Sequence, residues 1–189
     1  QFRGAEIRPR DNGVAVDGTI DLGSSANRFK DAYLSGGVYL GGTGSANKLD
    51  DYEEGTWTPV FSDATSGGNT ATGLIRGLYT KTGNQVTVNC CANNLSRTGM
   101  TGSADLRIQG LPFTPTAYSS PNQFWHGGTR LGAVIFSTSG FVSAYVTDNN
   151  TYVRLGESIS GVTIDNIICS QLYEGTADVE FTITYQTNS

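Results

Sequence analysis

The clearest pattern in the chain is an alternation of apolar and polar side chains over residues 177–185. The apolar members are Val179, Phe181, Ile183 and Tyr185, and every residue between them is polar. Successive side chains of a strand point to opposite faces, so this period of two predicts an antiparallel strand with one face in a core and the other in water.

Two further alternating runs, residues 74–81 and 85–92, flank the turn Thr82-Gly83-Asn84 and predict a β-hairpin. In the second run Cys90 belongs to the apolar class, so Cys91 is expected to point the opposite way. Further strands are predicted at residues 105–109, 129–137, 141–147, 151–156 and 162–170. Short strands at this spacing predict an all-β fold, an antiparallel β-sandwich head of jelly-roll-like form over residues 50–189.

The run 130–136 differs from the others because both of its alternation classes are apolar. Leu131 lies in one class, and Val134 and Phe136 lie in the other. A strand of this kind needs cover on both faces, and a two-layer sandwich covers only one. The run is therefore a candidate subunit contact.

The first 49 residues are rich in glycine and serine and have too few apolar residues to form a core. Apolar spacing predicts a short helix over residues 27–34, followed by a brief strand at 38–40. Such a segment is unstable alone. We therefore expect residues 1–49 to form a slender stalk in which three copies of the chain share one apolar axis.

Composition narrows the function classes. The formal net charge is −5 and no Lys/Arg cluster is present, which argues against nucleic-acid binding. No apolar run approaches the roughly 20 residues that span a bilayer, so we expect no membrane insertion. The three cysteines lack the spacing of a disulfide framework or a zinc site, and free buried thiols in a protein assembled in the cytoplasm are expected. Because the sequence begins at Gln1, we expect it to belong to a longer protein.

Several blocks of the sequence, in order, resemble the C-terminal regions of tailed-bacteriophage tail fibres and tail spikes. The blocks are DLGSSANRFKDAYLSGGVYLGG, LDDYEEGTWTPVF, GLYTKTGNQVTV and GLPF. The resemblance implies a slender trimeric stalk followed by a receptor-binding tip, and it transfers no catalytic residue. It also implies stalk packing by Arg28, Phe29, Tyr33, Val38 and Leu40, with Trp57 as an anchor where the head begins.

Two acidic constellations are candidates for chemistry. The run Asp50, Asp51, Glu53 and Glu54 offers carboxylates for a calcium ion, but it lacks the alternating spacing of a calcium loop and reads more simply as a solvated acidic turn.

Asp178 and Glu180 share one face of a strand at a separation that suits a glycosidase pair, although outward acids on a terminal strand are usually solubilising. His126 is the sole histidine and no nucleophile elbow accompanies it. We therefore predict no catalytic residue, no metal and no cofactor.

Binding residues are usually displayed on loops of a rigid scaffold, and two loops are candidates. Aromatic rings stack on sugar rings, and side-chain amides and arginine form hydrogen bonds with sugar hydroxyl groups. The first loop offers Tyr118, Asn122, Gln123, Phe124, Trp125, His126 and Arg130. The second offers Tyr145, Asp148, Asn149, Asn150 and Tyr152. The alternative for both is that the aromatic rings fold inward or pack against another subunit.

Together these features predict the receptor-binding tip of a homotrimeric phage tail fibre, located in the virion and assembled in the host cytoplasm. Its partners would be the rest of the fibre and a host-surface glycan or outer-membrane protein. Three weak sites on one tip would act through avidity. The alternatives are a glycan-depolymerising spike fragment and a purely structural trimerisation or cap module.

Overall fold

A computed structural model describes residues 7–65, 68–116, 124–137 and 140–188. The chain divides into two compact units, Gln1–Gly36 and Gly37–Ser189, a division that falls earlier than the predicted stalk–head boundary at residue 49. The elements are β1 (Arg10–Asp11), β2 (Val14–Ala15), β3 (Val38–Tyr39), η1 (Ser45–Asn47), β4 (Lys48–Leu49), β5 (Tyr52–Trp57), β6 (Val60–Asp63), β7 (Thr72–Thr82), β8 (Gln85–Ser96), β9 (Leu106–Gln109), β10 (Phe124–Gly132), β11 (Phe141–Thr147), β12 (Tyr152–Ser158), β13 (Asp165–Asn166), η2 (Cys169–Gln171) and β14 (Ala177–Gln186).

The first unit has little regular structure in its described part. A two-residue hairpin joins β1 and β2, and none of the described side chains in the unit is buried. The predicted helix over residues 27–34 is wrong, since this segment contains no helical turn. A helix of this length is not stable alone. Phe29 and Tyr33 are 65% and 93% exposed, so packing of these side chains against the chain does not stabilise one.

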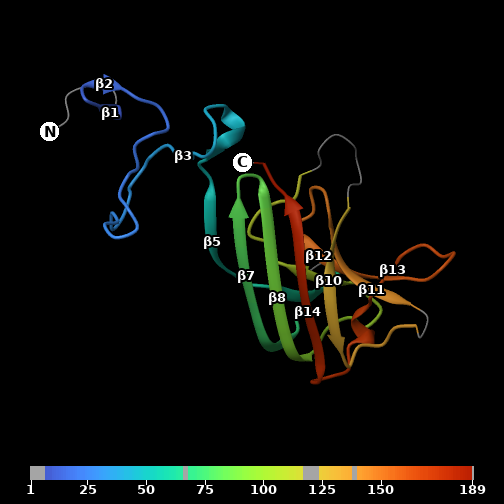
Figure 1. Ribbon diagram of the computed structural model, residues 1–189. Helices are drawn as coiled ribbons and strands as arrows, with labels where there is room; N and C mark the ends of the chain where they lie inside the picture. Colours follow the sequence, from blue (N-terminus) through green and yellow to red (C-terminus); the bar gives the residue numbers. More distant parts are fainter. Residues whose placement is uncertain (1–6, 66–67, 117–123, 138–139, 189) are drawn as a thin grey trace. The chain divides into compact units, whose positions relative to one another are not determined.

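The second unit is built on one large antiparallel sheet that curls on itself, in the order β5-β7-β8-β14-β10-β11-β12-β9-β6 (Figure 1). The long strands β7, β8 and β14 lie side by side, and β13 pairs with β12. A small separate pairing joins β3 to β4. The predicted fold class is confirmed: the protein is all-β, with a curled antiparallel sheet consistent with a jelly-roll-like sandwich.

One apolar core lies between the two halves of the curled sheet. Along β14 the predicted alternation holds, with its apolar members buried and the residues between them more exposed. Along β8 it also holds, so that Cys90 is buried and the half-buried Cys91 points away. The other half of the sheet contributes Phe61 from β6, Ile108 from β9 and Leu155 from β12, all fully buried.

Strand β10 departs from the prediction. It begins at Phe124, earlier than the predicted residue 129, and ends at Gly132. Its end is set by Ala133, which has a φ of 50° in the left-handed region. This turn breaks the alternation on which the prediction of a doubly covered strand rested.

As a result, Leu131 and Val134 do not lie on opposite faces: both are partly buried and both pack against the core of their own chain. Phe136 is 42% exposed and follows the end of the strand. A subunit contact through these residues stays a prediction, and only Phe136 offers a large exposed surface for it.

Candidate functional site

Three aromatic side chains gather on the outward face of β10 and β11. The Phe124 and His126 rings stack with centroids 6.1 Å apart, and each lies 5.9 Å from the Tyr145 ring. His126 is paired with Tyr145 across the two strands. Tyr145 is buried and donates a hydrogen bond to Asn166 Oδ1 (2.6 Å), whereas Phe124 is 49% exposed. The cluster therefore presents two exposed rings, Phe124 and His126, against the buried Tyr145.

The neighbouring residue Trp125 points the other way, is half-buried and packs against the core. The sequence assigned Phe124, Trp125 and His126 to a loop, but they lie in strand β10, and its alternation separates them. The other residues predicted for this surface, Tyr118, Asn122 and Gln123, lie outside the described residues.

Arg130 is separated from the aromatic cluster because β10 changes partner along its length. Residues 124–127 pair with β11, and residues 128–132 pair with β14. Gly127 permits this change, since a Cβ at this position would lie 2.0 Å from the Thr182 carbonyl oxygen. Arg130 forms an ion pair with Glu180 at 2.9 Å.

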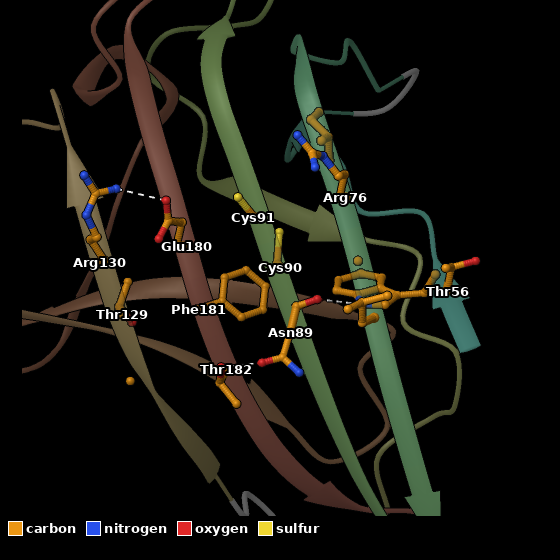
Figure 2. A pocket seen from close by; sticks show the side chains of 15 residues that line it. Thr56, Arg76, Asn89, Cys90, Cys91, Thr129, Arg130, Glu180, Phe181 and Thr182 are labelled. Atoms are coloured by element: carbon orange, nitrogen blue, oxygen red, sulfur yellow. Dashed lines mark hydrogen bonds and ion pairs between the residues drawn. The ribbon is translucent and has the colours of Figure 1, made fainter. Parts of the chain in front are cut away.

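That ion pair borders a groove of about 970 Å³, which crosses β5, β7, β8, β14 and β10 (Figure 2). No residue of β6, β9, β11 or β12 lines it, and its lining includes the core residues Trp57, Cys90 and Phe181. Asn89 and Thr182 form part of its lining, and the Thr182 hydroxyl donates to Asn89 Oδ1 (2.7 Å). Leu78, 58% exposed, adds an apolar surface.

The second predicted surface, at the β11–β12 hairpin, is also only partly open. Asp148 and Asn150 are half-buried, whereas Asn149 is exposed and adopts a φ of 60° at the turn. Tyr152 is half-buried beneath two arginines, Arg107 and Arg154, whose Cζ atoms lie 4.7 and 5.1 Å from its ring centroid. Sequence reasoning missed both arginines.

The sequence does contain a signal for Arg107 and Arg154. Arg107 stands between buried Leu106 and Ile108, and Arg154 stands between buried Val153 and Leu155. A single basic residue between two inward-facing apolar residues must project from the opposite face of its strand. What the sequence does not contain is the pairing of β9 with β12, which brings the two arginines to one tyrosine.

The four clustered carboxylates each have their own partner. Asp50 forms an ion pair with Lys48 at 2.8 Å, and Asp51 with the buried Lys81. Glu53 accepts a hydrogen bond from Tyr79, and Glu54 accepts one from Tyr52 (2.7 Å). In the part of the chain that the structure describes, no group of three or more potential ligand side chains is placed to hold a metal ion.

The proposed glycosidase pair is likewise engaged. Asp178 Oδ1 accepts a hydrogen bond from the Asn94 amide (3.1 Å), and Glu180 is paired with Arg130. Both carboxyl groups therefore have partners within the chain itself.

The residues predicted to pack in a trimer fall into two groups. Phe29, Tyr33, Val38 and Leu40 are all exposed, from 40% to 93%. Trp57 is instead 6% exposed and donates its indole N–H to the Asn89 carbonyl (3.0 Å). Trp57, expected as an anchor where the head begins and as a candidate for trimer packing, therefore packs in the core of its own chain.

The fold is similar to that of Dettilon tailspike protein (gp208), known from a crystal structure, with a TM-score of 0.56 and 18% sequence identity. The similarity covers 71% of this chain and 24% of the tailspike chain, so the chain spans about a quarter of that protein. At this identity the likeness establishes a shared fold. Scans against protein-family models and curated proteins gave no match. No helix in the described residues is long and apolar enough to cross a membrane.

Proposed function

We propose that this chain is a receptor-binding part of a phage tail fibre or tail spike that recognises a glycan on the host surface. The fold shared with a tailspike supports the phage setting. The observation that carries the binding function is the aromatic cluster, in which an exposed Phe124 ring is held by His126 and the buried Tyr145. A fixed aromatic face needs little ordering on binding and stacks well on the apolar side of a sugar ring.

Binding of the purified chain to an array of bacterial surface polysaccharides tests this proposal. F124A should lower the apparent affinity for the bound glycan about 3–10-fold, which is the effect of losing one aromatic stacking contact. Tyr173, 56% exposed and outside the cluster, supplies the control Y173A, which should bind like the unmodified chain. Absence of any bound glycan, or equal binding by F124A, would refute glycan recognition at this cluster.

We further propose that the chain assembles as a homotrimer through its N-terminal segment. The support is that its large apolar side chains are exposed in a single chain, and Leu22, Phe29 and Tyr33 are exposed at 65% or more. Sedimentation of the purified chain should give a species of three chains. F29D/Y33D should shift it toward the monomer, and a monomeric unmodified chain would contradict this assembly.

In this proposal the chain binds glycan without cleaving it and resides in the virion. The engaged state of Asp178 and Glu180 supports the absence of hydrolysis. The test is to incubate the chain with the polysaccharide that it binds and to assay reducing ends. Their accumulation would favour a depolymerising spike instead, and undiminished cell adsorption after F124A would favour a purely structural module.

A further inference from the structure

Two arginines from different strands meet at one tyrosine on the outward face of the β11–β12–β9 half of the sheet. Arg107 on β9 and Arg154 on β12 place their Cζ atoms 4.7 and 5.1 Å from the Tyr152 ring centroid. Arg154 Nη2 also donates to the Tyr152 hydroxyl (3.0 Å). Contact of both guanidinium groups with one ring fixes them near each other, although like charges repel.

Neither guanidinium has an anionic partner among the described residues. The ion pairs among the described residues are formed by other cations, such as Arg130 with Glu180 and Lys81 with Asp51. Asp105, two residues before Arg107, instead accepts a hydrogen bond from Asn166 (2.8 Å).

The Nε atoms of Arg107 and Arg154 are both shielded from solvent and donate no hydrogen bond to any described residue. Buried N–H groups are nearly always paired, and a guanidinium matches the two oxygens of a carboxylate or phosphate. In a chain of net charge −5, two neighbouring arginines without a carboxylate form a local site for an anion.

This pair adjoins the aromatic cluster. Tyr145 is paired with Arg154 across β11 and β12, and His126 is paired with Tyr145 across β10 and β11. His126, Tyr145 and Arg154 therefore form one row across three neighbouring strands. With strands about 4.8 Å apart, Arg154 begins roughly 10 Å from the strand that carries Phe124.

We infer that Arg107 and Arg154 form the anion subsite of the receptor surface, taking a carboxylate or phosphate group of an acidic glycan while a neighbouring sugar ring stacks on Phe124. This inference rests on the proposed function and names the receptor class, an acidic rather than a neutral glycan. Tyr152 holds the two guanidinium groups in place for the anion.

The anion subsite is tested directly with small probes, without knowledge of the host. The full chain is titrated with sodium D-glucuronate, inorganic phosphate and D-glucose by calorimetry at constant ionic strength. Glucuronate or phosphate should bind about tenfold or more tightly than glucose, as expected for charge-assisted hydrogen bonds. Equal or absent binding of both anions relative to glucose overturns the inference and requires no variant.

The double variant R107Q/R154Q should abolish this preference, and R76Q, on an exposed position of the other half of the sheet, should keep it. Circular dichroism checks that the variants fold. If the double variant does not fold, the single variant R107Q replaces it and should weaken anion binding about tenfold. A folded variant that retains the full preference for anions overturns the assignment to these residues.

The polysaccharide array separates failure of the inference from failure of the proposed function. Bound glycans should carry uronate or phosphate. Loss of binding after carboxyl reduction or after dephosphorylation of each glycan should show which anion is recognised. Binding confined to neutral glycans overturns the anion subsite and leaves glycan recognition intact. Anion binding in the calorimeter without any glycan bound on the array overturns the proposed function and leaves the subsite.

Discussion

The contact between Gly77 and Trp57 is the sharpest test of how the head is packed. Trp57 on β5 is paired with Gly77 on β7, and its indole ring lies over the glycine to reach the Asn89 carbonyl on β8. A Cβ at position 77 would lie 2.5 Å from Trp57 Nε1, whereas ordinary contacts begin near 3.4 Å. In G77A the indole must therefore move by about an ångström.

The cost of G77A follows from three effects. Overpacking of a core contact costs about 1–3 kcal/mol, and loss of the indole hydrogen bond costs about 1 kcal/mol more. Alanine recovers roughly 0.5–1 kcal/mol because glycine is unfavourable within a strand. The free energy of unfolding should fall by about 2 kcal/mol, which for a chain of this length lowers Tm by ~4–8 °C.

Thermal melts and urea titrations measure this change, and Gly128 provides a matched control. Gly128 lies in β10 of the same sheet, is exposed, and has no atom within 4 Å of its would-be Cβ. G128A should therefore leave Tm unchanged or raise it slightly. Equal melting of G77A and the unmodified chain would refute the packing argument, as would an undiminished cost of G77A in a W57A background.

Three further predictions concern buried polar groups and thiols. Hydrogen bonds from the Thr65 hydroxyl and the Thr101 amide hold the pKa of Asp63 well below its ordinary 3.8, so unfolding free energy should fall as pH drops through acid values, and D63N should flatten that dependence. Burial raises the pKa of Tyr185, so the free energy of unfolding should decline above pH 10, where the unfolded chain loses this proton more readily than the folded chain. The Tyr185 hydroxyl donates to a backbone carbonyl (2.9 Å), and Y185F should therefore lower the free energy of unfolding measured by chemical denaturation by about 1 kcal/mol. Iodoacetamide should label half-buried Cys91 in the folded chain but not Cys90, because burial raises the pKa of the Cys90 thiol to about 12. Mass spectrometry of the labelled peptides measures this, and labelling of Cys90 before Cys91 would contradict the prediction.

Strands with an unbroken alternation could be predicted closely from the sequence. The bounds of β11, residues 141–147, were predicted without error, and the β7–β8 hairpin was predicted with its turn. In β8 and β14 the apolar positions decide which face is buried, so local pattern and tertiary structure agree. The burial of Cys90 and the opposite direction of Cys91 follow from the same rule.

Prediction failed where the backbone leaves the regular pattern. Ala133 in the left-handed region ended β10 early, and no local residue signals this, since alanine rarely adopts such a φ. The partner change at Gly127 moved Arg130 away from Phe124, although the two are near in sequence. Such features depend on contacts between distant segments, which a single sequence does not contain.

The proposed binding surface was only half visible in the sequence. Phe124 and Tyr145 stand out as aromatic residues near turns, and both belong to the cluster that the structure assembles. Arg107 and Arg154 acquire meaning only through the antiparallel neighbours β9, β12 and β11, which convert isolated basic residues into a pair beside that cluster. These strands also carry buried core residues between the arginines and tyrosines, so the surface is held on strands that are anchored in the core. In the proposed receptor role, a surface built in this way would meet its ligand with little loss of conformational entropy, which would suit weak sites that act together.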